Sequence, residues 1–436
     1  MSIAGDKATS SETPADDRNK IYDQYCHLKI DSLILYLLVG LLSIRWLPSV
    51  APSVLINTQK ILMITFVLLQ VGKVLYNGHI SVPWPSVVFS GIVVGIWILS
   101  YGYLTKALII SFGISSIVYF SQNRGAIKTT FSIFTLSLII VSLYSLIVTF
   151  TPISGFEING LLYTGYKNPV DRFHHPRILQ NSFGFYGGRG IYVLISIAFV
   201  FSATLAMRES SKLHLLGSII LSTQLINIWW LTGSGRAGLL LPAFLLVILF
   251  TNWAGAEDLI PVIVFSPLIF WIIIYIAHFY INIATFIDIL DNITSYRLSI
   301  YFESIEVIIN NRRSLIGWGP APWGEYSLID LGAEPRSRVH GPELTRPHNT
   351  IFEFIIQYGI AAGSLLIYIC WQMVYIAAKE AENPTSAIYL SLAVVLAGTI
   401  FVGLAVGGKT GPYSINNEAM IIWWLGLGAI VSEYVS

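Results

Sequence analysis

Charged side chains are scarce in this chain. Asp, Glu, Lys and Arg make up 11% of its 436 residues, while hydrophobic residues make up 55%. Soluble domains carry roughly a quarter charged residues, and the mean hydropathy of this chain is +0.69. The composition therefore excludes an ordinary soluble domain and predicts an all-α polytopic membrane protein.

Two further shortages exclude other classes. The formal net charge is only +1, whereas nucleic-acid-binding domains are usually strongly basic, so no nucleic-acid partner is expected. The two cysteines, Cys26 in a polar segment and Cys370 in an apolar run, predict neither a disulfide framework nor a structural zinc site. The polar start of the chain also differs from a cleaved signal peptide, whose apolar core lies near the first residue.

Long apolar runs are abundant. A helix needs about 20 mostly apolar residues to cross a bilayer. We predict twelve such helices, at residues 33–47, 61–76, 87–103, 107–120, 131–150, 191–206, 215–231, 237–250, 259–281, 350–377, 387–406 and 419–431.

Basic residues indicate the orientation of these spans, because short cytoplasmic loops carry an excess of Lys and Arg. The side of the N-terminus holds Lys7, Arg18, Lys20, Lys29, Arg124, Lys128, Arg208, Lys212 and Lys379. The opposing short loops hold Lys60, Lys106, Arg236 and Lys409. This modest bias predicts that both termini are cytoplasmic and that the two long loops face outward.

The spans and loops divide the chain into four parts. Residues 1–30 form a cytoplasmic tail, residues 31–281 hold nine spans with an outer loop at 151–190, residues 282–348 form a large outer loop, and residues 349–436 hold three spans. Apolar spacing in the large loop predicts an amphipathic helix over 295–310, either flat on the membrane or packed on the spans. The segment GWGPAPWG then reads as a turn region.

Three residues at the predicted outer ends of the spans are candidates for chemistry. Arg236, in TGSGRAG, can bind two phosphate oxygens or extend towards lipid headgroups. Arg297 opens the amphipathic helix, where a solvated charge is the plainer interpretation. His348 lies where the large loop meets the next span, and its imidazole can accept a proton from a hydroxyl or, with Asn349, cap the helix.

The first long loop adds a basic and aromatic cluster, YKNPVDRFHHPR, which contains Arg172 and Arg177. Arg189 lies at the mouth of the next span, and Lys409 lies in GGKTGPYS before the last span, on the same predicted side. Adjacent histidines diverge and no other ligand has zinc-like spacing, so no metal site is expected. The cluster suits an anionic or sugar ligand, with a solvated loop as the alternative.

The order of these motifs carries a resemblance. An SGR turn opens one span, and about sixty residues later comes the helix RLSIYFESIEVI, then LIGWG, then PHNTIFEFIIQYGIAAGSLLI. This order resembles the O-antigen ligase and polymerase superfamily of bacterial inner membranes. The likeness is specific over residues 233–366 and general elsewhere, and the first loop departs from the family's Asn-Pro-Asn-type segment.

The resemblance implies a GT-C-like glycosyltransferase with a periplasmic active site. Such enzymes take a glycan from undecaprenyl pyrophosphate and need no metal or other cofactor. By position, Arg236 and Arg297 would neutralise the pyrophosphate leaving group, and His348 would be the general base on the acceptor hydroxyl. Arg172, Arg177, Arg189 and Lys409 would line the substrate site, although which first-loop arginine contacts the donor stays open.

Four interpretations remain, two within this family and two outside it. A ligase, slightly favoured by the motif order, passes the glycan to lipid A-core, whereas a polymerase passes it to another lipid-linked repeat unit. A lipid-linked glycan transporter is expected to place paired charges or broken helices near the membrane midplane. The charges here crowd the outer ends of the spans instead, which disfavours a transporter, and the polar groups inside the spans, notably Gln70, Lys73 and Gln357, are too few for a proton relay. A purely structural membrane protein would give Arg236 and His348 no reason to face the same side.

Overall fold

The structure is a computed structural model, and it describes twelve stretches of the chain. These are residues 30–43, 52–77, 104–150, 156–158, 161–163, 187–232, 258–281, 297–319, 327–333, 347–381, 387–405 and 417–432.

Helices account for nearly all of the described residues. They are α2 (Pro52–Asn77), α4 (Leu104–Gln122), α5 (Gly125–Phe150), α7 (Gly187–Glu209), α8 (Lys212–Thr232), α10 (Leu259–Ile281), α12 (Arg297–Asn310), η2 (Arg312–Leu315), α13 (Thr350–Ala381), α14 (Ala387–Ala405) and α15 (Asn417–Ser432). A further apolar helix covers Ile30–Ser43.

Ten of the twelve predicted spans fall on these helices, and the spans predicted at 87–103 and 237–250 lie outside the described residues. Within the described residues, six helices are long and apolar enough to cross a membrane: Val54–Tyr76, Gly125–Ile147, Ile191–Glu209, Leu259–His278, Thr350–Lys379 and Ala387–Ala405. The chain is therefore a multi-pass α-helical membrane protein.

One short hairpin interrupts the helical pattern. Strands β1 (Phe156–Ile158) and β2 (Leu161–Tyr163) pair antiparallel, with Phe156 opposite Tyr163. The hairpin belongs to the loop predicted at residues 151–190. The prediction of an all-α chain is thus confirmed for the described residues except at this hairpin.

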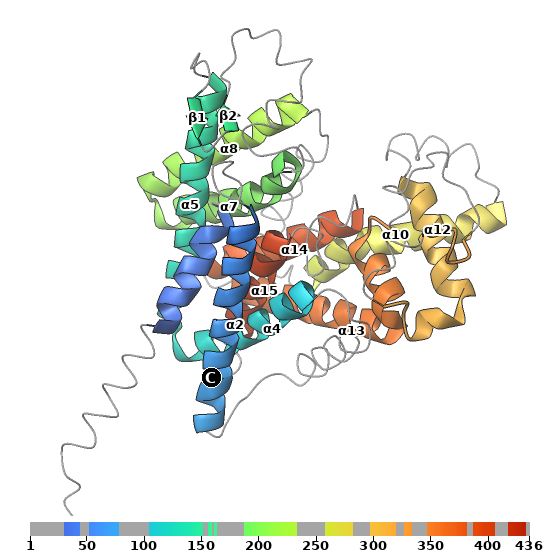
Figure 1. The fold of residues 1–436 in the computed structure, drawn as a ribbon. Coiled ribbons are helices and arrows are strands. Elements are labelled where there is room, and N and C mark those ends of the chain that lie inside the picture. Colours follow the sequence, from blue (N-terminus) through green and yellow to red (C-terminus); the bar gives the residue numbers. More distant parts are fainter. Residues whose placement is uncertain are drawn as a thin grey trace, which may run out of the picture.

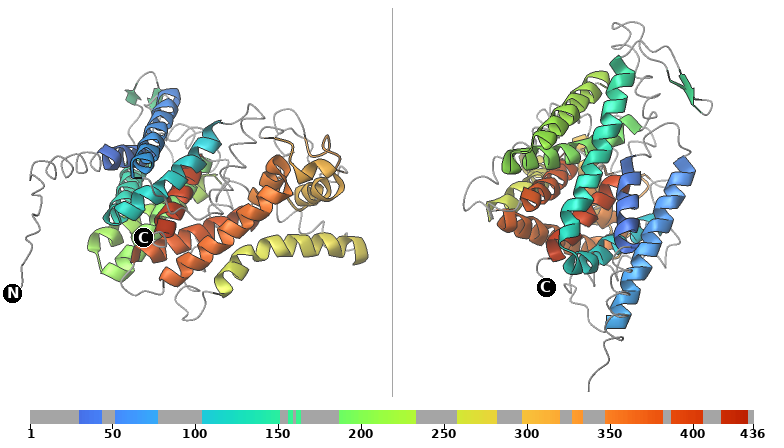
Figure 2. Two further views of the ribbon diagram at one scale, coloured as in Figure 1. Left: turned by 90° about the horizontal axis from the view of Figure 1, so that it is seen from below. Right: turned by 90° about the vertical axis from the view of Figure 1, so that its left-hand side faces the viewer.

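Most helices form one bundle with a continuous apolar core. Helix α14 packs on α7, α10 and α13, while α4 packs on α2 and α15, and α8 packs on α5 and α7. Helices α10 and α13 both extend from the bundle to α12, which lies at its far end in two views (Figures 1 and 2). The segment that carries Arg297 is therefore held by the ends of two long helices.

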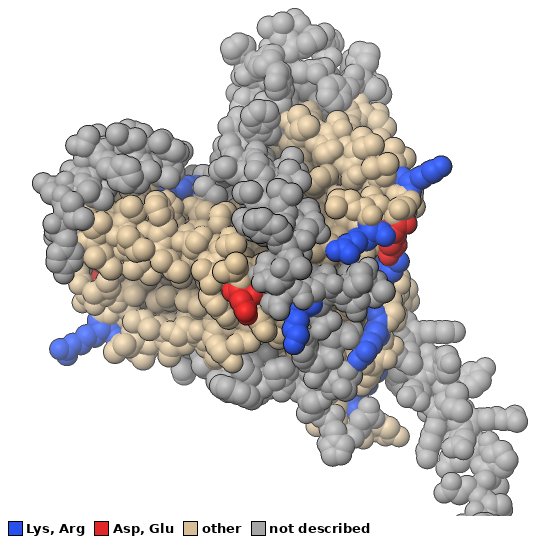
Figure 3. Space-filling view, turned by 180° about the vertical axis from the view of Figure 1, so that it is seen from behind, with Lys and Arg blue, Asp and Glu red and all other residues tan. Residues whose placement is uncertain are grey.

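The outer surface of the bundle is largely uncharged. Among the described residues, Lys, Arg, Asp and Glu are few on the face seen in Figure 3, and most of them lie on one side of it. Large apolar side chains such as Leu68, Leu136 and Ile273 are exposed on the helices instead. Such exposure is unfavourable in water and is expected where a helix faces lipid.

Small residues bring α4 and α15 close together. A Cβ added at Gly113 would lie 2.5 Å from Cβ of Trp424, and one added at Gly428 would collide with Ser116. Apolar lipid provides no hydrophobic force between helices, so close van der Waals packing at small residues takes its place. The fully buried Trp423 and Trp424 fill the space beside this contact.

Replacing Gly113 by Ala should destabilise the protein by about 1–3 kcal/mol, because the added methyl group overpacks the contact with Trp424. The measurement is the thermal unfolding midpoint of the detergent-purified protein. Gly72→Ala is the matched control, since an added Cβ there meets nothing within 4 Å. Equal midpoints for the two variants would show that α4 and α15 do not pack closely at Gly113.

Candidate functional site

Helix α12 is buried along most of its length. Every residue from Arg297 to Val307 is buried, including the charged Arg297, Glu303 and Glu306. The predicted amphipathic helix therefore packs on the spans instead of lying flat on the membrane. Arg297 is only 4% exposed, so its interpretation as a solvated charge is wrong.

Two apolar clusters hold α12 in place. On one side Leu298, Tyr301, Phe302 and Ile305 pack with Trp271, Ile274 and Tyr275 of α10 and with Phe352 of α13. On the other side Ile300 and Val307 pack with Ile356 of α13 and with Leu328, Leu331 and Ala333. The helix is thus wedged between α10 and the first turns of α13.

The turn that supplies Leu328 and Leu331 is closed by Asp330. The amide and the hydroxyl of Ser327 both donate to Oδ2 of Asp330 at 2.7 Å. These bonds, the amide first, lower the pKa of this exposed carboxyl. Because the folded pKa is lowered, the turn gains stability above the unfolded pKa and loses it as the pH falls through the folded pKa.

Tyr301 connects α12 to the start of α13. It lies one turn after Arg297, so the two side chains share a face of the helix. Its hydroxyl donates to the carbonyl oxygen of His348 at 3.5 Å, and its ring meets Trp271 edge-on with 5.1 Å between centroids. The fold thereby brings Tyr301, one turn into α12, to the backbone of His348. We refer to Trp271, Arg297, Tyr301, His348 and Asn349 as the Arg297–His348 cluster.

Asn349 begins α13 and joins it to α14. Its Oδ1 accepts the amide hydrogens of Ile351 at 3.0 Å and Phe352 at 3.2 Å, which makes it the helix N-cap. Its Nδ2 donates to the carbonyl oxygen of Leu404 at 3.0 Å, and Nε1 of Trp271 donates to the same oxygen at 3.0 Å. The last turn of α14 is therefore fixed beside His348.

His348 itself has an unusual backbone. Its φ is 50°, in the left-handed region that residues other than glycine seldom adopt. Such a conformation costs about 1–3 kcal/mol and persists only where the surroundings impose it, most often at functional sites. Here the neighbours Pro347 and Asn349 are buried, and the side chain of His348 is half-buried.

The GWG motif packs against a break in α13. Gly359 has φ 89° inside the helix, and the amides of Trp318 and Gly319 donate to the carbonyl oxygens of Ile356 at 2.8 Å and Gln357 at 2.9 Å. A Cβ added at Gly359 would lie 2.5 Å from the Leu315 carbonyl oxygen, and one at Gly317 would collide with the Gln357 carbonyl. The glycines therefore allow two backbones to touch.

Buried carboxylates lie on the two helices that meet here. Glu303 and Glu306 on α12 and Glu353 on α13 are each less than 5% exposed, and Nε2 of Gln357 donates to Oε1 of Glu353 at 3.5 Å. Within the part of the chain that the structure describes, no group of three or more His, Cys, Asp and Glu side chains is placed to hold a metal ion.

Of the seven predicted site residues, the structure describes the side chains of Arg297 and His348. Arg297 lies one turn before Tyr301 on α12, and Tyr301 donates to the backbone carbonyl of His348. Arg172, Arg177, Arg236 and Lys409 lie outside the described residues. Arg189 lies in the first turn of α7, which begins at Gly187, and only its backbone is described. The segment containing Lys409 follows directly after α14, whose Leu404 contacts Asn349 and Trp271.

A second polar cluster lies between the helix Ile30–Ser43 and α2. Asp31 is fully buried, pairs with Lys73 and accepts a hydrogen bond from Nε2 of Gln70 at 2.8 Å. Beside it the hydroxyls of Ser32 and Tyr119 lie 2.7 Å apart. The sequence indicated Lys73 and Gln70 as polar groups within a span but missed their acidic partner.

Sequence reasoning also missed Trp271, Tyr301 and the bridging role of Asn349. One signal was present: Tyr301 follows Arg297 by four residues, the spacing of neighbours on a helix face. Another was an acid at the start of one apolar run, Asp31, and a base near the end of the next, Lys73. Trp271 offered no signal, since it lies in the middle of an apolar run.

No protein-family model, curated protein or solved structure matches this chain. Membership of the O-antigen ligase and polymerase superfamily therefore stays a prediction that depends on the motif order alone.

Replacing Asn349 by Ala should destabilise the protein by about 1–3 kcal/mol, because two cap bonds and the bond to Leu404 are lost in a buried setting. Asn349→Ser should be intermediate, since it retains the cap but not the link to α14. The measurement is the thermal midpoint in detergent. Asn123→Ala is the control, as its side chain makes one bond, to the Tyr119 carbonyl at 3.1 Å. A midpoint for Asn349→Ala equal to that of Asn123→Ala would contradict the bridging role.

Proposed function

We propose that this chain is a glycosyltransferase of the bacterial inner membrane that moves a glycan from undecaprenyl pyrophosphate to an acceptor hydroxyl on the periplasmic face. The acceptor is lipid A-core, as in an O-antigen ligase. The architecture proposed with this function is GT-C-like with twelve spans. The observation that carries the proposal is the Arg297–His348 cluster, in which the buried Arg297 lies one turn before Tyr301 and Tyr301 donates to the backbone carbonyl of the strained His348.

In the proposed reaction, the acceptor oxygen attacks the anomeric carbon of the donor sugar. The bond from that carbon to the phosphate oxygen breaks, and undecaprenyl pyrophosphate leaves with the electron pair. His348 accepts the acceptor's hydroxyl proton, since an imidazole titrates near neutrality. Arg297, with Arg236, balances the charge that develops on the leaving pyrophosphate.

The rigidity of the cluster supports these roles. Charge placed in advance around a leaving group lowers the barrier because it needs no rearrangement during the reaction. Arg297 lies on a helix packed on two sides, and His348 is followed by an N-cap bonded to a third helix.

The test is glycan transfer by the purified protein with undecaprenyl-pyrophosphate glycan, in one tube with lipid A-core and in another with donor alone. His348→Ala should lower transfer by roughly 10²-fold or more, as expected for loss of a general base. Arg297→Gln should lower it by about 10²–10³-fold, and Arg297→Lys by less.

Matched variants separate chemistry from folding. His214→Ala, at the start of α8, and Arg312→Gln, an exposed residue of η2, should transfer normally. Variants are compared at equal amounts of folded protein, judged by thermal midpoint. Normal transfer by His348→Ala would remove its catalytic role, while a product ladder from donor alone would identify a polymerase.

One observation favours a second candidate, a lipid-linked glycan transporter. The ion pair between Asp31 and Lys73 is a paired charge of the kind expected in such a protein, although it lies at the ends of two helices and not at the midplane where a transporter is expected to place it. For a glycosyltransferase the same pair serves only to hold α2 against the helix Ile30–Ser43.

Asp31→Asn separates the two candidates. For the glycosyltransferase we expect a lower thermal midpoint, because Lys73 loses its partner, but unchanged transfer per folded molecule. The measurements are the midpoint, glycan transfer and the movement of labelled lipid-linked glycan across proteoliposomes. Wild-type movement across the bilayer that Asp31→Asn abolishes would support the transporter and contradict the enzyme.

A further inference from the structure

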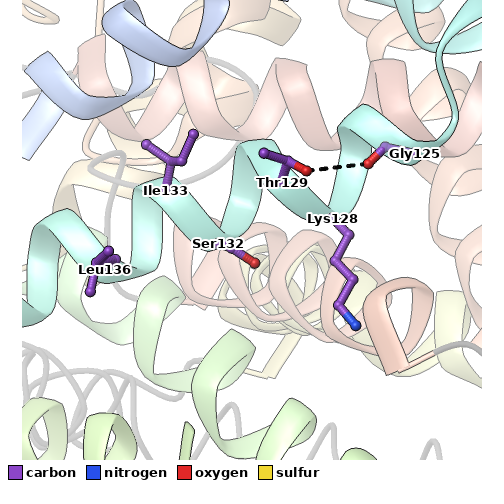
Figure 4. Close-up of a pocket in the computed structure, with 6 residues that line it drawn as sticks. All are labelled: Gly125, Lys128, Thr129, Ser132, Ile133 and Leu136. Carbon is purple, nitrogen blue, oxygen red and sulfur yellow. Dashed lines mark hydrogen bonds between the residues drawn. The ribbon is translucent and has the colours of Figure 1, made fainter. Parts of the chain in front are cut away.

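A hollow opens on the side of α5, away from the Arg297–His348 cluster. It has a volume of about 390 Å³ and is lined by Gly125, Lys128, Thr129, Ser132, Ile133 and Leu136. Figure 4 shows Lys128 and Ser132 directed to the same side of the helix, while the hydroxyl of Thr129 bonds to the Gly125 carbonyl. The hollow is polar where α5 begins and apolar further along.

Cations gather around the polar end of the hollow. Lys128 donates to Oε1 of Glu209 at 2.7 Å, which joins the start of α5 to the end of α7. Arg124 precedes α5, Arg208 lies in the last turn of α7, and Lys212 begins α8, and all of these are exposed. Among the described residues at these helix ends, four cations stand against one carboxylate, so the described part of this end carries a net positive charge.

One face of α5 continues from the polar end into lipid. Lys128, Ser132 and Leu136 follow one another at four-residue spacing, and Ile140, Leu143 and Ile147 extend the same stripe. The last four of these six side chains are between 45% and 60% exposed. From Ser132 to Leu143 the helix rises about 16 Å, which is roughly half of a 30 Å hydrocarbon core and thus one leaflet.

We propose that this face of α5 binds one anionic phospholipid. Its phosphate lies at Lys128 and Ser132, within the field of Arg124, Arg208 and Lys212, and one acyl chain lies along the stripe from Leu136 to Ile147. A free phosphate would use the cations but not the stripe, and a neutral lipid would use the stripe but not the cations. The site is independent of the proposed glycan transfer.

The experiment measures binding of phosphatidylglycerol to the full-length protein in a zwitterionic detergent, by native mass spectrometry and by the shift in thermal midpoint. Phosphatidylcholine and inorganic phosphate are measured in the same way as comparison ligands. Lys128→Gln should weaken phosphatidylglycerol binding roughly five-fold, the effect of one cation near an anionic lipid. Glu209→Gln should strengthen it, because it removes the competing carboxylate.

The control is Lys379→Gln, an exposed lysine in the last turn of α13 that is predicted to lie on the same side of the membrane. It should bind like the wild type. Ser132→Phe tests the hollow without changing any charge, and it should weaken binding. The proposal is overturned if phosphatidylcholine or inorganic phosphate gives an equal shift, or if Lys128→Gln and Lys379→Gln bind alike.

Discussion

The need to satisfy backbone hydrogen bonds inside a membrane protein governs the site region. Helix α13 breaks at Gly359, and a break removes the partners of the carbonyl groups before it. The amides of Trp318 and Gly319 take the place of those partners at Ile356 and Gln357. The GWG motif thus supplies backbone hydrogen-bond donors to the broken helix. Glycine is required at the contact because a side chain would push the two backbone segments apart.

The contact between the GWG motif and α13 determines where the candidate site lies. Because α13 breaks, its first turns form a short helix that packs with α12 instead of continuing the line of the span. Helix α12 then fills the space between those turns and α10, and its buried face carries Arg297 one turn before Tyr301, which bonds to the backbone of His348. The segments that carry the family-like motif order therefore meet through a change of helix direction.

Single polar side chains in this protein bond to several groups at once. Asn349 satisfies two amides of α13 and one carbonyl of α14, and Trp271 shares that carbonyl. Asp31 binds both Lys73 and Gln70. The bonds to Leu404 and to Asp31 join helices that apolar contacts alone would hold less specifically, since lipid and core are equally apolar. The Lys128–Glu209 pair differs, because it is exposed and adds little to stability.

The two proposed sites differ in burial and in the residues that form them. The Arg297–His348 cluster is buried, rigid and built from three helices, as suits a reaction at fixed atoms. The face of α5 is exposed and changes from basic to apolar residues along the helix. Such a surface fits a lipid that exchanges with the membrane. The positive-inside rule predicts that they lie on opposite sides of the bilayer.

Hydropathy by itself determined the class of the protein and the approximate place of ten helices, because apolar length is a local property of the chain. Helical spacing likewise determined α12, and the polar-to-apolar change at His348 predicted the start of α13. Tertiary structure decided that Arg297 is buried, that Tyr301 meets His348, that Gly359 breaks a predicted span and that Asp31 pairs with Lys73. These depend on contacts between residues tens of positions apart, and no local pattern of polarity specifies which buried partner a side chain will meet.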